Sequence, residues 1–198
     1  MEKFYLEVPG MERKYEALGY IKEHREYNSN VNGSGSLDRY ADNNDYEGWL
    51  KKLDEEAVIE PNEERVPRRT FFLVRENDNR IVGMINIRTA LNERVKNFGG
   101  HIGYGIRPTE RGKGYNKINL YLGLKVCQEY GIKEALLDAD VENLASWKTM
   151  EALGGVRIRE YYSEEHGETI VDYSINVDGS LEKYKDIYEP QIVKEKIK

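Results

Sequence analysis

The chain has 198 residues, which is enough for one domain with a sizeable hydrophobic core. Its 36 Asp and Glu residues outnumber its 30 Lys and Arg residues and give a formal charge of −6. This acidic balance argues against nonspecific nucleic-acid binding, so we expect no nucleic-acid partner. The single cysteine, Cys127, excludes an internal disulfide framework and is expected to be packed. The three histidines are dispersed without metal-ligand spacing, so no metal site is expected.

Membrane insertion is not expected either. The sequence holds no stretch approaching the roughly 20 apolar residues of a membrane-spanning helix. Its start is not a basic segment followed by an apolar run, so no signal peptide is evident. We therefore expect no membrane partner and a cytoplasmic location.

The N-terminal part is predicted to contain one strand and two helices. Alternating apolar residues predict a strand over residues 4–8, and helical spacing predicts a helix over residues 11–27. Residues 28–36 are rich in Asn, Gly and Ser and are predicted to be a polar loop. Ser36 is suited to cap one helix from Leu37 onward, which is expected to carry Tyr40, Tyr46, Trp49 and Leu50 toward a core.

A β-hairpin is predicted next. Residues 70–74 and 80–87 are strongly apolar strands, joined by an Asn-Asp-Asn turn. Residues 91–100 are predicted to form a loop, and residues 100–106 a further strand.

The turn after that strand is the most informative segment. Residues 111–116 read Arg-Gly-Lys-Gly-Tyr-Asn and lead into a predicted helix. Glycines let backbone N–H groups approach an anion closely, and a helix N-terminus adds unpaired donors and positive potential. The segment matches neither the dinucleotide fingerprint GxGxxG nor the P-loop GxxxxGK[ST]. It predicts a pocket for a phosphate-bearing cofactor; the alternative is an ordinary β-to-α turn with solvated cations.

The remaining elements alternate between helix and strand. The helix after the turn is predicted to end at Gly131, and a buried strand is predicted over residues 135–139. A second helix is predicted to run through Leu153 and to end at a Gly-Gly pair. Two last strands are predicted, over residues 156–162 and 169–175.

The turn and its surroundings resemble the GCN5-related N-acetyltransferase (GNAT) superfamily over about residues 70–178. Arg111, Gly114 and Asn116 occupy the defined positions of its motif A, [RQ]xxGx[GA], although the family prefers Gly or Ala at the last. The segments "GGHIGYGIRP" and "NxASxKTxExxGG" are similar to those of a bacterial group of predicted acetyltransferases. The resemblance implies the α/β (α+β) GNAT acyl-CoA N-acyltransferase fold, with a central mixed, mostly antiparallel sheet flanked by helices.

The same resemblance implies one GNAT domain over residues 1–178 and a C-terminal tail over 179–198. Within the domain, residues 1–69 form an N-terminal strand and helices, and residues 70–178 form the core with the cofactor site. The implied activity is transfer of acetyl from acetyl-CoA to a primary amine, on a small molecule or a peptide, by direct attack. A non-catalytic acyl-CoA-binding module or sensor, another acyl group, and a homodimer all stay open.

The resemblance also implies which residues bind acetyl-CoA. The backbone at the turn would face the pyrophosphate, and the Ile106 amide is an expected donor to the developing oxyanion. Asn143 would contact the cofactor arm, cap the following helix, or do both. Arg107 would contact phosphate or face solvent. The implied cofactor-binding residues are Ile106, Arg111, Gly112, Lys113, Gly114, Tyr115, Asn116 and Asn143.

Proton transfer is where the sequence departs from the family. Many members have a tyrosine seven residues after the position of Asn143, where this chain has Met150, which cannot donate a proton. Ser146 is the expected proton donor to the leaving thiolate, and Thr149 is expected to point elsewhere. His101 is the expected base because imidazole titrates near neutral pH.

Other residues are weaker alternatives for the same chemistry. Tyr104 lies on the same strand as His101 and is an alternative base. Asp138 and Asp140 end the next strand and are suited either to bind a cationic acceptor or to act as solvated or capping carboxylates.

Overall fold

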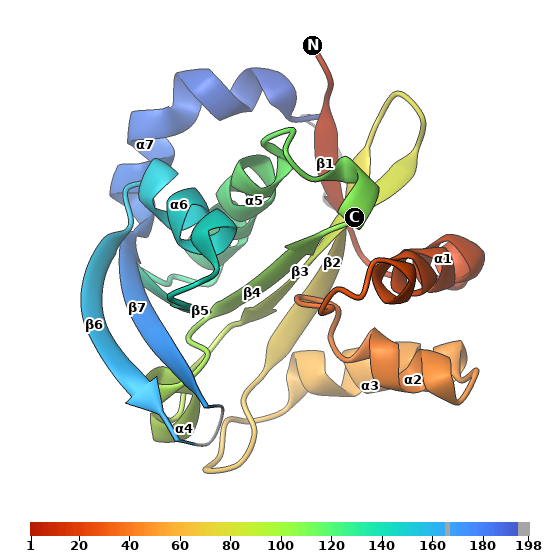
Figure 1. Ribbon diagram of the computed structural model, residues 1–198, viewed down its shortest axis with the longest axis horizontal. Helices are drawn as coiled ribbons and strands as arrows, with labels where there is room; N and C mark the ends of the chain where they lie inside the picture. The colour runs from red at the N-terminus through yellow and green to blue at the C-terminus, as the bar shows by residue number, and fades with distance from the viewer. Residues whose placement is uncertain (165–166, 194–198) are drawn as a thin grey trace.

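The computed structural model describes residues 1–164 and 167–193 (Figure 1). Two antiparallel sheets are flanked by helices, which confirms the expected fold class. The four-stranded sheet has the order β1-β2-β3-β4, and the three-stranded sheet has the order β5-β7-β6. The strands are β1 (Phe4–Glu7), β2 (Arg68–Arg75), β3 (Arg80–Arg88), β4 (Ile102–Ile106), β5 (Glu134–Asp140), β6 (Val156–Ser163) and β7 (Glu168–Asn176).

Helices cover both faces of the four-stranded sheet, as Figure 1 shows. On one face lie α1 (Lys14–Glu26), α2 (Leu37–Asp42) and α3 (Tyr46–Val58). The other face is covered by α5 (Tyr115–Glu129), with α6 (Leu144–Ala152) and α7 (Val177–Tyr188) beside it. One further short helix, α4 (Glu93–Asn97), precedes β4.

Each face of this sheet has its own hydrophobic core. Trp49 of α3 is fully buried and stacks on Phe72 of β2, with ring centroids 6.0 Å apart. On the opposite face α5 packs its buried residues, including Cys127, against β3 and β4. Helix α5 ends as predicted, because Gly131 has a φ of 73° and its N–H donates to the Gln128 carbonyl at 2.9 Å. The buried side chains of β4, at Ile102, Tyr104 and Ile106, belong to the core on the α5 face.

Two local predictions are wrong. Ser36 has a φ of 69° and makes no side-chain cap, and the helix expected from Leu37 is divided into α2 and α3. The break follows from Asn44, which adopts a φ of 53°, and from Asp45, whose Oδ1 accepts from the Gly48 N–H at 2.9 Å and caps α3. The loop expected over residues 91–100 contains α4.

Helix α7 crosses residue 178, where the sequence places the start of the C-terminal tail. The Tyr121 hydroxyl of α5 donates to the Leu181 carbonyl at 3.3 Å, and the Tyr121 and Tyr188 rings lie 5.1 Å apart. This part of the tail is therefore packed on the domain, while residues 194–198 lie outside the described residues. None of the described helices has the length and apolar character to cross a membrane.

Candidate active site

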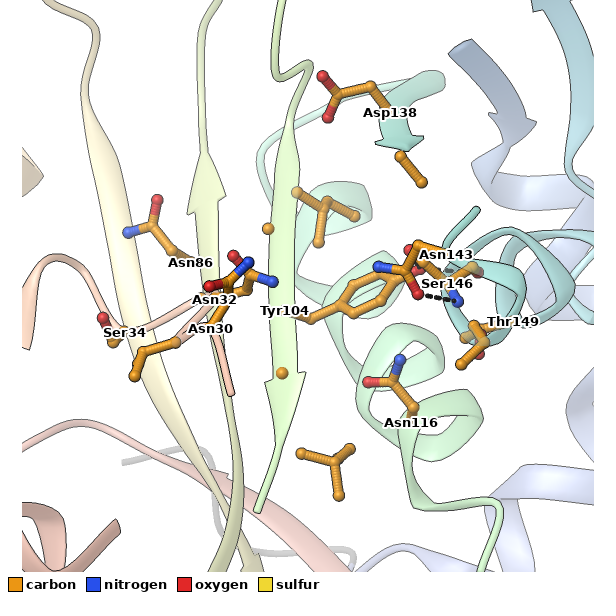
Figure 2. A pocket seen from close by; sticks show the side chains of 18 of the residues that line it. Asn30, Asn32, Ser34, Asn86, Tyr104, Asn116, Asp138, Asn143, Ser146 and Thr149 are labelled. Atoms are coloured by element: carbon orange, nitrogen blue, oxygen red, sulfur yellow. Dashed lines mark hydrogen bonds between the residues drawn. The ribbon is translucent and has the colours of Figure 1, made fainter. Parts of the chain in front are cut away.

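An open cleft of about 1040 Å³ lies where β4 and β5 separate. One side is formed by residues 29–36, which connect α1 to α2, and the floor by residues 102–106 of β4. The turn before α5, the end of β5 and the beginning of α6 complete it. Figure 2 shows Asn86 on one side of β4, and Asp138 and the side chains of α6 on the other. The cleft therefore brings together segments that are far apart in the sequence.

The edge of β4 that faces the cleft carries backbone groups that β3 does not use. The His101 carbonyl accepts from β3 at 2.7 Å, and the Arg107 N–H donates to β3 at 2.9 Å. Because alternate residues of an antiparallel strand face the same neighbour, the N–H and C=O groups of Tyr104 and Ile106 point away from β3. No ladder joins β4 to β5 in the described part of the chain. An extended ligand has a strand edge to pair with here.

The turn before α5 is shaped to receive an anion. Gly112 and Gly114 have φ values of 76° and 82°, a conformation that side chains rarely adopt. Among the described residues, no atom lies within 4 Å of the position that a Cβ would take at either glycine. Helix α5 begins directly after this turn and has 15 residues. Its first residues line the cleft, so the unpaired backbone N–H groups of its N-terminus open onto the cleft.

A second observation points to a ligand at this turn. The Oδ1 atom of Asn116 is buried and has no hydrogen-bond partner among the described residues. Asn116 lines the cleft and lies at the second position of α5 (Figure 2). An unpaired buried polar atom costs stability unless something else satisfies it.

The charged and aromatic side chains of the turn do not all face the cleft. The Arg111 Nε donates to the Ile106 carbonyl at 3.1 Å, and its Nη2 donates to the Ser29 Oγ at 2.7 Å. Lys113 does not line the cleft, because its Nζ pairs with Glu110 at 2.8 Å. The Tyr115 hydroxyl donates to the Glu2 carboxylate at 2.6 Å, away from the turn. The glycine backbone therefore carries most of the anion-binding geometry.

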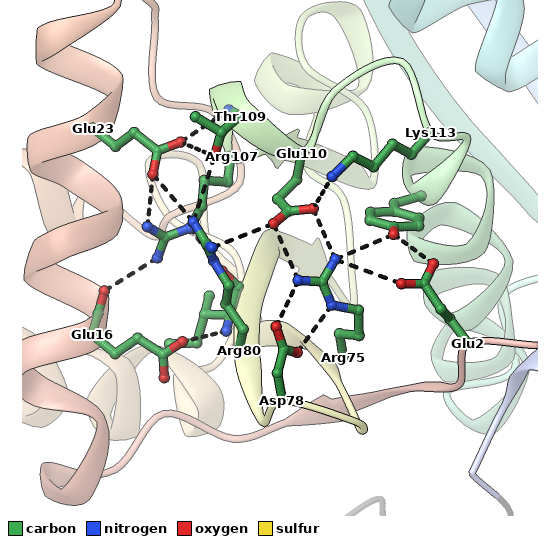
Figure 3. Close-up of polar contacts among 12 residues, drawn as sticks. Glu2, Glu16, Glu23, Arg75, Asp78, Arg80, Arg107, Thr109, Glu110 and Lys113 are labelled. Atoms are coloured by element: carbon green, nitrogen blue, oxygen red, sulfur yellow. Dashed lines mark hydrogen bonds and ion pairs between the residues drawn. The ribbon is translucent and has the colours of Figure 1, made fainter.

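A buried ion network holds the turn in place (Figure 3). Glu110 is only 3% exposed and accepts from Arg75 of β2 at 2.8 and 3.2 Å. Arg107 pairs with Glu23 of α1 at 2.9 Å, and its Nε donates to the Ile81 carbonyl at 2.9 Å. Arg107 is thus a buried structural residue, and neither a phosphate contact nor a solvent-facing side chain.

The N-terminus of α6 brings two predicted residues, Asn143 and Ser146, to the cleft. The Asn143 Oδ1 accepts from the Ser146 N–H at 3.2 Å, which confirms its capping role. The Tyr104 hydroxyl donates to the Ser146 carbonyl at 3.2 Å and lies 3.2 Å from the Ser146 Oγ. Burial raises the pKa of Tyr104, so this hydroxyl keeps its proton at neutral pH. Met150 is buried, whereas Thr149 lines the cleft, contrary to the expectation that it points elsewhere.

His101 is not brought to the cleft. Its backbone N–H donates to the Leu136 carbonyl of β5 at 2.6 Å, and its ring Nδ1 accepts from the Leu136 N–H at 2.9 Å. Burial, and then the nearby charge of Arg88, lower its pKa to about 4. The His101 ring therefore links the start of β4 to β5. Its Nδ1 already accepts a hydrogen bond from the Leu136 N–H.

The loop over residues 29–36 lies directly on β4. A Cβ at Gly33 would come within 2.7 Å of the Tyr104 Cα, and a Cβ at Gly105 would come within 2.8 Å of the Asn32 carbonyl oxygen. The alternating glycines of β4, at 103 and 105, therefore allow the loop to rest against the strand. Figure 2 shows Asn30, Asn32 and Ser34 on the same side of β4 as Asn86.

Carboxylates end β5 on the far side of the cleft. The Asp138 Oδ2 accepts from the Gly99 N–H at 2.9 Å, and burial raises the pKa of Asp138. The Asp140 Oδ1 accepts from the Glu142 N–H at 2.9 Å and stabilises a turn. Asp138 is the better placed of the two to meet a ligand.

Three residues that the sequence analysis did not select also line the cleft. Arg68 of β2 and Asn86 and Arg88 of β3 lie on the side of the loop over residues 29–36. Asn86 interrupts an otherwise apolar run in β3. This polar residue was the sequence signal that could have identified it as a cleft residue. Among the described residues, no group of three or more His, Cys, Asp or Glu is arranged to hold a metal ion.

Comparison with known proteins gives one family. A model of the acetyltransferase (GNAT) family matches residues 36–155. The chain is similar to the ribosomal-protein-S5-alanine acetyltransferase from Vibrio fischeri, with a TM-score of 0.65 and 15% identity over 89% of this chain and 94% of that one. It is also similar to Mycobacterium smegmatis RimJ in complex with CoA-disulfide, with a TM-score of 0.67 and 13% identity over 92% and 89% of the two chains.

A further similar structure is a chimera of spermidine N-acetyltransferase SpeG from Vibrio cholerae and hSSAT. Its TM-score is 0.61, with 15% identity over 91% of this chain and 99% of that one. At these identities the structures share the fold of this chain. No curated protein matches the sequence.

Proposed function

Because the chain belongs to the GNAT acetyltransferase family, whose model matches residues 36–155, we propose that it transfers an acetyl group from acetyl-CoA to a primary amine. One observation carries the proposal. The glycine turn at the start of α5 opens onto a cleft floored by the edge of β4 that no β5 ladder covers among the described residues. A diphosphate would bind at the turn, and an extended arm would lie along the edge.

The residues present suit coenzyme A as a substrate. Backbone N–H groups at residues 111–116 would receive the pyrophosphate, and the Asn116 side chain would gain a partner there. Arg111 would add charge, since its contact with Ser29 is exposed and replaceable. Lys113 would contribute only after leaving Glu110. Asn143 would lie beside the arm that enters between β4 and β5.

Transfer would proceed by direct attack of the amine nitrogen on the thioester carbonyl carbon. The Ile106 N–H, which points away from β3, would donate to the carbonyl oxygen as negative charge develops on it. The C–S bond then breaks, and the thiolate leaves. Ser146, in contact with the Tyr104 hydroxyl, would supply a proton to the thiolate.

The incoming amine must also lose a proton. His101 is a poor base here, because its Nδ1 accepts from the Leu136 N–H and the residue does not line the cleft. We assign removal of this proton to Asp138, directly or through water. Its carboxylate lines the cleft and is held in place by a hydrogen bond from the Gly99 N–H.

One observation favours a second function. Met150 occupies the position where many family members have a proton-donating tyrosine, and it is fully buried. A domain that binds acyl-CoA without turnover, as a sensor, is consistent with this residue.

Turnover separates the two functions. Acetyl-CoA is mixed with the protein and a panel of amines, and free CoA thiol is measured against the hydrolysis background. Binding is measured in parallel by calorimetry. Thiol release that depends on an amine supports the enzyme, whereas binding without release supports the sensor. No binding of acetyl-CoA by folded protein would reject both.

A further inference from the structure

The side of the cleft formed by β2 and β3 carries two arginines that face each other. Arg68 and Arg88 are directly paired in the register of the two strands, and both line the cleft. Like charges in this position destabilise a sheet unless other groups compensate them. The nearest carboxylate, Glu56, lies 3.7 Å from the Arg68 Nε but also pairs with Lys52 at 2.8 Å. Positive charge therefore exceeds negative charge on this side.

Arg88 is held rigidly in this arrangement. Its Nη1 donates to the carbonyls of Gly99 and Gly100, both at 2.8 Å. Burial, and then the charge of Arg68, lower the pKa of Arg88. The carboxylates of Asp138 and Glu56 act on this pKa in the opposite direction, so the charge of the fixed guanidinium is partly compensated.

The opposite side of the cleft has the other sign of charge. Asp138, Asp140 and Glu168 line it. Asp140 pairs with Ile170 of β7, so these three carboxylates project from one face of the β5–β7 sheet. Figure 2 shows Asp138 across β4 from Asn86. The cleft is thus basic along β2 and β3 and acidic along β5 and β7.

A buried amide lies beside the arginines. Asn86 is 8% exposed, and its Nδ2 donates to the Thr70 Oγ1 at 2.8 Å. The described residues offer no donor to its Oδ1, which is left as an acceptor in a residue that lines the cleft. This oxygen is not among the fully buried polar atoms that lack a partner, so a ligand N–H is able to reach it from the cleft.

We infer that the acceptor is zwitterionic, with a primary amine and a carboxylate a few bonds apart, as in a free amino acid. Arg68 and Arg88 would bind the carboxylate, because a guanidinium matches its two oxygens. Asp138 and the Asn86 Oδ1 would receive the ammonium before it is deprotonated. The inference rests on the proposed function, and it names the acceptor class of the same site.

The test uses matched acceptors. Each α-amino acid is compared with its amide and with the amine that lacks the carboxyl group, at equal concentrations of neutral amine. The kcat/KM for CoA thiol release is measured. We expect at least one amino acid to exceed its amide by about tenfold or more, the effect of one charge-assisted hydrogen-bond pair.

Variants locate the effect. Arg68→Gln should lower the acid-to-amide ratio of kcat/KM by about tenfold while sparing the amide, and Arg68→Lys should retain part of the ratio. Arg65→Gln is the matched control, since Arg65 is exposed and does not line the cleft. If Arg68→Gln does not fold, the ratio of the unmodified protein decides.

Two outcomes overturn different statements. If amides or simple amines match the amino acids, the acceptor is not zwitterionic, and the acetyltransferase activity stands. If acetyl-CoA binds and no amine of any kind releases thiol, the proposed function itself is wrong.

Discussion

Arg75 and Glu110 form a buried ion pair at 2.8 Å that ties β2 to the turn before α5. The side chains are 10% and 4% exposed, and Asp78 and Lys113 complete their hydrogen bonds. The turn before α5 is thus fastened to β2 by buried charged groups. Stability and donor binding should therefore respond together when this pair is broken.

Glu110→Gln should lower the free energy of unfolding by about 1–3 kcal/mol, because it removes one buried charge partner of Arg75, which keeps its ion pair with Asp78. Burial raises the pKa of Glu110, but hydrogen bonds from Lys113 and Arg75 outweigh it, so the pKa is lowered in the fold. The stabilisation by the Glu110 carboxylate is fully present above its ordinary pKa of 4.5. It is lost as the pH falls through the lower pKa of the folded state. Urea unfolding measures it.

The matched control is Glu55→Gln on the exposed surface of α3. It should change the free energy of unfolding by less than about 0.5 kcal/mol. Equal effects of the two variants would show that the ion pair contributes nothing special.

Gly114→Asp should abolish acetyl-CoA binding while leaving a folded domain, because it places a carboxylate beside the proposed diphosphate site. The φ of 82° costs a side chain about 1–2 kcal/mol, but space is open around the Cβ position. Gly114→Asn carries the same strain without the charge and should bind at least about tenfold more tightly than the Asp variant. Calorimetry with acetyl-CoA compares them; unchanged affinity in the Asp variant would remove the turn from the site.

His101→Asn should alter the pH dependence of stability more than the rate. The folded pKa of about 4 lies below the ordinary 6.5, so the fold binds the neutral ring. The contribution of the neutral His101 ring to the free energy of unfolding is fully present above pH 6.5. It falls by about 1.4 kcal/mol per pH unit as the pH is lowered toward 4. The variant should lose this slope, as urea unfolding at pH 7.5, 6 and 5 would show.

The amide of the variant can still accept from the Leu136 N–H, so the fold should persist. A large fall in kcat with an unchanged pH profile of stability would contradict this view and return His101 to the catalytic step.

Ser146→Ala should lower kcat by about tenfold or more and leave the affinity for acetyl-CoA nearly unchanged, because the hydroxyl is proposed to act on the leaving thiolate. Tyr104→Phe should have a smaller effect, and the double variant should lose less than the sum, since the two hydroxyls lie 3.2 Å apart. Stopped-flow thiol release measures kcat. Ser174→Ala, on β7 outside the cleft, is the control; full activity of Ser146→Ala would show that the thiolate needs no donor.

Apart from α4, the order of elements from β2 to β7 was predictable because its signals are local. Apolar runs marked the strands, and Gly131 marked the end of α5. The turn before α5 was found for the same reason, since adjacent residues create it. Asn44 was a missed local signal: Asn tolerates positive φ, and its place inside a predicted helix concealed the break before α3.

The acceptor side depended on contacts that no local pattern encodes. Arg68 and Arg88 face each other only through the register of β2 and β3. His101 looked catalytic because of its residue type and its strand, whereas the approach of Leu136 from β5 decided its role. Both contacts join segments that are distant in the sequence. They could not be predicted from local patterns in a single sequence.

The glycines at 103 and 105 have a consequence for how this protein diversifies. They let the loop over residues 29–36 sit on one surface of β4, while the backbone edge of the same strand is left to the proposed acyl donor. In the proposed complex, main-chain atoms would recognise the donor, and mutation leaves these atoms in place. A connecting segment and a few strand side chains would select the acceptor. Mutations in these segments would therefore change the amine acceptor while thioester binding is kept.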